Sequence, residues 1–222
     1  MVTCFEMLRE RLPVRYLENS WVAFSSRFLG WNHGFDDKVK RLLDITLASG
    51  GLLLASPLIL LIAFAVRTTS RGPALFRQER VGLRGGIYVI LKFRSMRVDA
   101  EQDGAEWAKE DDPRSTGLGL FLRKMHLDEL PQLWNVLRGD MSLVGPRPEL
   151  PWVVDEYEPW QRQRLSVQPG MTGWWQIQGR GEVPLHENVE LDLYYIQNYS
   201  PLLDLMILWR TIWVVLSGRG AY

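Results

Sequence analysis

The sequence predicts a mostly helical α+β protein that combines a membrane-inserted helical segment with a folded domain at the membrane surface. Three observations support this prediction: an uncharged apolar run from Ile45 to Val66, a pair of β-prone segments joined by glycines, and several segments of helical pattern after residue 115. We divide the chain into an N-terminal extension of unassigned role, a membrane segment, and a folded domain with interfacial helices, which cover residues 1–35, 36–71 and 72–222.

The composition narrows the class of protein. The 222 residues suffice for one core, or for one core plus a membrane element. Lys plus Arg number 26 and Asp plus Glu number 26, so no basic excess points to a nucleic-acid partner. The single cysteine, Cys4, forms no internal disulfide and lies in a terminal segment without a nearby histidine, which argues against a catalytic thiol. Charged residues within 1–20 leave no apolar core for a cleavable signal peptide.

The apolar run within residues 36–71 is long enough for a membrane span, which needs roughly 20 residues. Two features argue against a plain transmembrane helix. Ser56-Pro57 lies in the middle of the run, and Pro57 removes a backbone donor and crowds the preceding turn. Basic residues flank both ends, so positive charge gives no orientation. A re-entrant helix–break–helix, which enters and leaves by one face, satisfies both flanks and is favoured. A kinked span and a buried soluble helix remain alternatives.

The remainder of the chain alternates short elements. Ala74–Val81 and Ile87–Arg94 are β-prone and are separated by three glycines, which predicts a hairpin. Residues 99–113 are acidic and polar, as expected of a solvated helix or loop. The other predicted elements, in chain order, are helices over 117–125 and 127–138, a rigid loop over 139–150, a helix over 149–167, a strand over 171–178, and helices over 185–198 and 201–216.

Tryptophan is abundant, with ten residues. Tryptophan side chains fill cores but are also favoured at a membrane–water boundary, and the sequence leaves both interpretations open. The predicted helix over 201–216 carries Trp209 and Trp213 and is interrupted by Asp204 and Arg210, so it is interpreted as an interfacial or core helix rather than a clean span. The sequence is compatible with a homo-oligomer formed through the Trp-rich helices but does not specify one.

The candidate chemistry centres on Asp128 and Glu129 at a predicted helix start. One acid there suffices for the helix dipole, and for an isolated Asp-Glu pair a capping role is the simpler interpretation. Phosphoryl chemistry gives such a pair a function, because one carboxylate can attack phosphorus while the second takes or relays a proton. Mg2+ would offset the repulsion between carboxylate and phosphate. The candidate phosphate-binding cations are Arg123, Arg147, Lys92 and Arg94.

Several motifs in one order carry a family resemblance. They run from about residue 38 to the C-terminus: Lys40-Arg41-Leu42-Leu43-Asp44, Ser56-Pro57, Lys92-Phe93-Arg94-Ser95-Met96, Leu127 to Leu137 (LDELPQLWNVL), Gly139-Asp140-Met141-Ser142, Val144-Gly145-Pro146-Arg147-Pro148, Pro169 to Trp174 (PGMTGW) and Glu190 to Tyr195 (ELDLYY). With these motifs the chain resembles the bacterial sugar transferase family, the monotopic phosphoglycosyl transferases, in their small form.

The resemblance implies a function and a place for it. The reaction would move a sugar 1-phosphate from a UDP-sugar to undecaprenyl phosphate, with release of UMP, at the cytoplasmic face of the bacterial inner membrane among membrane lipids. It would initiate glycoconjugate or exopolysaccharide assembly. It also implies that Ser56 and Pro57 form the break that turns the membrane helix back. Neither the sugar nor the assembly pathway can be derived from the sequence.

The resemblance also implies roles for single residues. Asp128 resembles the nucleophile that forms a phosphosugar–enzyme intermediate, with Mg2+ at Asp128 and the donor pyrophosphate. Glu129 resembles its partner, which deprotonates the lipid phosphate. Arg123 and Arg147 would hold phosphate groups, with Lys92 and Arg94 as further cations. Arg180 and Asp192 are candidates for donor binding.

Two residues depart from the family pattern, and two functions other than sugar-phosphate transfer are to be weighed. His126 and Trp175 stand where the family pattern leads us to expect smaller residues. A soluble glycoside hydrolase could use paired acids, but adjacent side chains rarely bracket a glycosidic bond at the required separation of about 5 to 9.5 Å. A non-catalytic membrane scaffold would not need the carboxylate at position 128.

Overall fold

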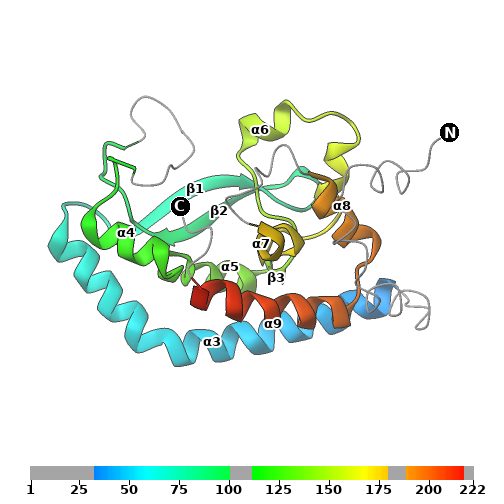
Figure 1. The fold of residues 1–222 in the computed structure, drawn as a ribbon, viewed down its shortest axis with the longest axis horizontal. Coiled ribbons are helices and arrows are strands. Elements are labelled where there is room, and N and C mark those ends of the chain that lie inside the picture. The colour runs from blue at the N-terminus through cyan, green and yellow to red at the C-terminus, as the bar shows by residue number, and fades with distance from the viewer. Residues whose placement is uncertain (1–32, 101–111, 180–188, 218–222) are drawn as a thin grey trace.

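The protein is described by a computed structural model that covers residues 33–100, 112–179 and 189–217, and it has the predicted α+β, mostly helical architecture. Two helices, α3 and α9, run along one side of the molecule, and the strands and shorter helices lie on the other side of them (Figure 1). The helices are α3 (His33–Thr69), α4 (Gly117–Lys124), α5 (Gln132–Arg138), α6 (Pro151–Asp155), α7 (Trp174–Gly179), α8 (Val189–Gln197) and α9 (Pro201–Ser217), and the strands are β1 (Leu75–Val81), β2 (Ile87–Phe93), β3 (Ser142–Val144) and β4 (Gly170–Thr172).

Helix α3 is continuous and contains Pro57, so the predicted interruption at Ser56-Pro57 is wrong: the helix bends but does not stop (Figure 1). The Ser56 hydroxyl donates to the Leu53 carbonyl at 2.8 Å, a local bond of a kind that commonly accompanies helix bending. By length and composition, residues Asp37–Thr69 could cross a membrane, and only 11% of the most apolar window is buried in the protein. Entry and exit by one membrane face remains a prediction.

Polar side chains attach the N-terminal half of α3 to the domain. Lys40 Nζ lies 2.5 Å from Asp204 Oδ2 of α9, and Arg41 donates to the carbonyls of Val136 and Leu137 at the end of α5. Asp44 accepts from Ser142 Oγ and the Leu143 amide at 3.0 and 2.9 Å. The three polar residues of the first family motif therefore hold the helix against the domain.

The β1–β2 hairpin confirms the predicted strand pair to within one residue at either end. The strands are antiparallel, with Leu75 opposite Phe93 and Arg80 opposite Tyr88. Asn135 of α5 closes the free edge of β2: its Oδ1 accepts from the Leu91 amide at 3.0 Å and its Nδ2 donates to the Val89 carbonyl at 2.7 Å. Since Asn135 is completely buried, one amide side chain substitutes here for a neighbouring strand and fixes α5 against the hairpin.

Four predicted elements after the hairpin need correction. The loop expected over 139–150 contains the short strand β3. The helix expected over 127–138 begins as the 3-10 turn Leu127–Glu129 and becomes α-helical only at α5. The helix expected over 149–167 is split into α6 and the 3-10 helix Gln161–Ser166. The strand expected over 171–178 is only β4, followed by α7.

The predicted helix over 185–198 is described from residue 189, as α8, and its start lies outside the described residues. The helix expected over 201–216 is present as α9. Most of the acidic segment 99–113 also falls outside the described residues.

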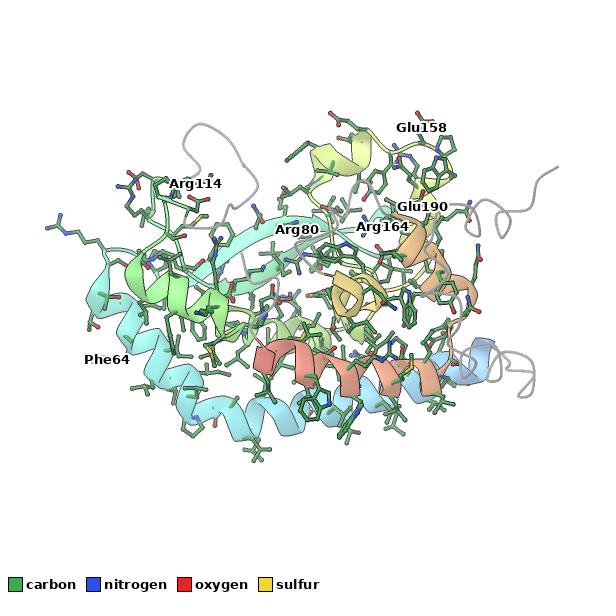
Figure 2. All side chains as sticks on the ribbon, viewed as in Figure 1. Phe64, Arg80, Arg114, Glu158, Arg164 and Glu190 are labelled. Atoms are coloured by element: carbon green, nitrogen blue, oxygen red, sulfur yellow. The ribbon has the colours of Figure 1, made fainter. Side chains whose placement is uncertain are left out.

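Some tryptophans lie in the core and others are exposed on helix surfaces, and placement of the exposed ones at a membrane boundary stays a prediction. Trp174 and Trp175 of α7 are buried with Tyr195 and Ile207 in a core between α7, α8 and α9. The outward side of α9 instead exposes apolar side chains, as does most of α3, and Figure 2 shows Phe64 on the outer side of α3. The large exposed apolar residues of these two helices are Leu42, Ile45, Leu47, Leu53, Leu54, Leu58, Leu60, Leu61, Phe64, Leu202, Leu205, Trp209, Ile212, Trp213 and Leu216.

Candidate active site

The carboxylate pair lies in the short 3-10 turn Leu127–Glu129 between α4 and α5. His126 precedes it with φ 54°, a left-handed conformation that a residue with a Cβ rarely adopts. This conformation ends α4 and redirects the chain, so that Asp128 and Glu129 turn into the protein with only 7% and 8% of their surfaces exposed. Two adjacent buried carboxylates require neighbouring cations, because burial of unpaired charge is costly.

Lys92 and Arg147 supply two of these cations and converge on one oxygen. Lys92 Nζ lies 3.0 Å from Glu129 Oε1, and an Arg147 guanidinium nitrogen lies 3.6 Å from the same atom. Burial lowers the pKa of Lys92 from its usual value, and the nearby charge of Glu129 opposes that shift. Lys92 comes from β2 and Arg147 from the loop after β3, so the pair of contacts joins segments that are distant in sequence.

Arg123 is the third cation near the pair, and its charge interacts with both acids, more strongly with Asp128. Its Nε donates to Ser95 Oγ at 3.0 Å. Burial lowers the pKa of Arg123, and Asp128 is the largest of the charges that oppose the shift. The position depends on Gly119 of α4, where an added Cβ would come within 1.8 Å of the Ser95 carbonyl oxygen. Only glycine allows α4 to approach the end of β2 this closely.

Arg94 is not brought into this cluster. It is buried, and its guanidinium donates to the carbonyls of Ser70 and Arg71, both at 2.8 Å, just after α3. The side chain therefore anchors the C-terminal end of α3, so its contacts support a structural role rather than phosphate binding. Arg94 directly follows Phe93, where β2 ends.

Of the two residues predicted to bind the donor, Arg180 and Asp192, the structure describes only Asp192. Arg180 lies outside the described residues. Asp192 of α8 is completely buried, and its Oδ2 lies 2.5 Å from Arg164. Burial raises the pKa of Asp192 to about 6, against the attraction of Arg164. Arg164 also donates to the Arg147 carbonyl at 2.8 Å. Asp192 is therefore connected, through Arg164, to the backbone of the loop that carries Arg147.

The chemistry of the site fits Mg2+ held jointly by protein and substrate. Within the described residues, no group of three or more His, Cys, Asp or Glu side chains could hold a metal ion alone. Mg2+ is commonly held by one or two carboxylates together with substrate phosphates, and Asp128 next to Glu129 offers that number of ligands. Asp128 is the residue that would carry the ion.

Sequence reasoning missed several residues that shape the site: Ser95, Gly119, Asn135, Arg164 and Arg80. Arg80 could have been predicted from the sequence, because strand alternation and the register of β1 and β2 put it on the same sheet face as Lys92. Its guanidinium donates to the Pro148 carbonyl at 3.1 Å. The others depend on contacts between distant segments, which no local pattern reveals.

Fold and site together define a class of protein: an apolar helix with little burial lies beside a domain that collects two buried carboxylates and three cations, as suits phosphate chemistry near a membrane. The chain belongs to the bacterial sugar transferase family, whose model matches residues 35–218.

Named relatives are similar over most of the chain. The galactosyl transferase CpsE of Streptococcus agalactiae is 43% identical over 98% of this chain and 50% of its own length. The UDP-N-acetylgalactosamine-undecaprenyl-phosphate N-acetylgalactosaminephosphotransferase of Aeromonas hydrophila is 42% identical over 82% of this chain and 45% of its own length. The chain thus spans about half the length of these relatives, whereas its match to the exopolysaccharide production protein ExoY of Sinorhizobium fredii, 38% identical over 82% of this chain, covers 88% of that protein.

Proposed function

We propose that the protein transfers a sugar 1-phosphate from a UDP-sugar to undecaprenyl phosphate through a covalent intermediate on Asp128. The observation that supports this most directly is the buried Asp128–Glu129 pair, enclosed by Lys92, Arg123 and Arg147. The family and the names of the relatives support the reaction class. The sugar is left open, because named relatives differ in it.

In the first half-reaction the Asp128 carboxylate attacks the phosphorus that carries the sugar. An oxygen–phosphorus bond forms, the bond to the bridging oxygen of the diphosphate breaks, and UMP leaves with that oxygen. Arg123 and Arg147 can each present two donors to phosphate oxygens, and Lys92 adds a third positive charge. Bound Mg2+ would supply charge neutralisation between the carboxylate and the diphosphate.

In the second half-reaction an oxygen of the lipid phosphate attacks the same phosphorus. The Asp128–phosphorus bond breaks, the carboxylate is regenerated, and the product is a polyprenyl diphosphate sugar. Glu129 takes the proton of the lipid phosphate, which makes its oxygen a better nucleophile. Lys92 Nζ donates to Glu129 Oε1 at 3.0 Å, and this salt bridge orients the Glu129 carboxylate.

Membrane attachment by α3 and α9 would bring this site to the lipid phosphate. We propose that the exposed apolar sides of both helices enter one leaflet on the cytoplasmic face of the inner membrane, and that α3 enters and leaves by that face. The bend of α3 (Figure 1), the proline within the helix and the basic residues at both of its ends support this arrangement.

The function is tested by UMP release from a panel of UDP-sugars, with and without undecaprenyl phosphate and Mg2+, for wild type and Asp128→Asn. Release that depends on lipid and Mg2+ and disappears in Asp128→Asn supports the proposal and identifies the sugar. Turnover that survives in the variant would exclude Asp128 as nucleophile. A membrane-inserted wild type without any turnover would favour the scaffold alternative.

The topology is tested by cysteine labelling in sealed membrane vesicles. Lys38→Cys and Arg71→Cys, each in a Cys4→Ser background, place one thiol at either end of α3. A membrane-impermeant maleimide should label both from the same side. Labelling from opposite sides would show that α3 spans the bilayer.

A further inference from the structure

The loop that carries Arg147 is tied down by its backbone oxygens. Four successive carbonyls, of residues 146 to 149, accept hydrogen bonds from the Gly170 amide, Arg164, Arg80 and the Val81 amide at 2.8, 2.8, 3.1 and 3.0 Å. Both prolines of the loop lack an N–H, and their rings fix φ. The donors come from three different segments of the chain, because Arg80 and Val81 are neighbours in β1, so the loop has little freedom to move.

Two of the four donors are arginine side chains on consecutive carbonyls, which is more charge than a loop backbone requires. Arg164 is the less accessible of the two, with its side chain only 2% exposed. It lies between two carboxylates: Asp192 at 2.5 Å and Glu149 at 3.6 Å. Tyr157 also accepts a hydrogen bond from it. A buried guanidinium is costly unless its donors are satisfied, and here each partner comes from a different segment.

We propose that Arg164 is a positioning residue for Arg147, held in place by Asp192 and acting through the Arg147 carbonyl. This inference rests on the proposed function, because it assigns the orientation of a guanidinium that we place on the donor phosphates. Arg164 itself does not touch substrate.

The geometry explains how a contact to the backbone matters for the side chain. The backbone carbonyl of Arg147 accepts a hydrogen bond from Arg164, and the guanidinium of Arg147 lies 3.6 Å from Glu129. If the carbonyl is released, the loop can shift and the guanidinium shifts with it. A misplacement of about 1 Å at a catalytic site can cost about 10²-fold in rate. Figure 2 shows Arg80 and Arg164 on the side of the domain away from α3, so the two arginines that hold the loop lie apart from the apolar helix.

A double-mutant cycle separates positioning from general structural damage. Arg164→Lys keeps the buried positive charge, but its single ammonium cannot reproduce the planar set of donors that serves both Asp192 and the Arg147 carbonyl. Its kcat/KM for UMP release should fall about 10²-fold. In an Arg147→Gln background the same change should cost less than about twofold, because the guanidinium it positions is gone. Arg162→Lys is the matched control, since Arg162 is exposed in the same 3-10 helix and the one side-chain contact described for it is a hydrogen bond to the Asp155 carbonyl.

The outcomes are distinct. Strong coupling between positions 164 and 147, with a normal Arg162→Lys, supports the inference. Equal losses from Arg164→Lys in both backgrounds would overturn it while leaving the function intact. A wild type that releases no UMP, or an Arg147→Gln enzyme with full activity, would remove its basis in the function itself. If Arg164→Lys does not fold, Asp192→Asn replaces it in the cycle, since this change keeps an acceptor oxygen for Arg164 and removes only the charge.

Discussion

Asp128 and Glu129 are adjacent in sequence, but they have different neighbours. Lys92 and Arg147 both approach Glu129, whereas Arg123 feels the charge of Asp128 more strongly than that of Glu129. The backbone turn after the left-handed His126 produces this separation. One acid can therefore act as nucleophile and the other as base without exchanging roles.

This division predicts different consequences for the two acids. Glu129→Gln should retain a single turnover of UMP release from the donor alone, because Asp128 performs that step. Steady-state transfer to lipid should fall about 10²- to 10⁴-fold through loss of the base. Asp128→Asn should abolish both. Rapid-quench measurement of UMP, with enzyme and donor at similar concentrations, distinguishes these cases, and an equal loss of both steps in Glu129→Gln would contradict the assignment.

Asp192 gives a pH-dependent prediction. Burial raises its pKa from 3.8 in the unfolded chain to about 6 in the folded protein, so the folded state binds the proton more tightly. Protonated Asp192 therefore contributes to the free energy of unfolding below pH 4, and this contribution is lost as pH rises through 6. Asp192→Asn carries no titratable group, so its stability relative to wild type should improve by about 3 kcal/mol between pH 4 and pH 7.

Thermal unfolding of both proteins across that range measures the difference. Asp155→Asn is the control, because Asp155 is exposed and should leave the pH dependence unchanged. A stability difference between wild type and Asp192→Asn that does not vary with pH would show that the group ionises normally.

At the scale of elements, the contact between α4 and the end of β2 sets the position of Arg123. Gly119→Ala would place a methyl group 1.8 Å from the Ser95 carbonyl oxygen, which forces the elements apart. We expect a loss of about 1–3 kcal/mol in the free energy of unfolding, together with reduced activity as Arg123 moves. Gly117→Ala is the matched control in the same helix, since a Cβ there meets nothing within 4 Å. Thermal unfolding and UMP release compare the two variants, and equal behaviour would mean that this close approach does not matter.

Elements that are determined by their local sequence were predicted well, and elements that are determined by tertiary packing were not. The β1–β2 hairpin follows from glycines and β-prone residues, and Gly139 ends α5 with φ 88°, as its sequence suggests. The strand expected over 171–178 fails because Trp174 and Trp175, which are β-prone residues, fill the core from a helix instead. The sequence grouped the two acids with Arg123, Lys92 and Arg147, and the structure brings these residues together. The anchoring contacts of Arg94 could not be predicted, because they are made to carbonyls more than twenty positions away.

At the scale of the whole molecule, α3 and α9, which carry many exposed apolar side chains, run along one side of the molecule, and the β1–β2 hairpin lies on the other side of them (Figure 1). The ion pair between Lys40 and Asp204 holds the two helices together, so their apolar surfaces can enter one leaflet as a unit. In the proposed orientation, the carboxylate pair would lie in the domain outside the bilayer, where it could meet both a soluble donor and a lipid phosphate at the interface.

This arrangement predicts that charge on the two sides has unequal effects. Leu54 is 84% exposed on α3, so Leu54→Lys removes almost no packing, but it places a charge where we expect bilayer. An inserted Lys costs about 2.5–3.5 kcal/mol, which corresponds to a loss of about 10²-fold in membrane partitioning. Ile87→Lys is the control: Ile87 is 55% exposed, but on the hairpin. Flotation with vesicles should separate the two variants, whereas thermal stability in detergent should match wild type for both. If Ile87→Lys weakened binding as much as Leu54→Lys, the membrane would contact the hairpin as well, and the orientation that brings Asp128 to the lipid phosphate would have to be revised.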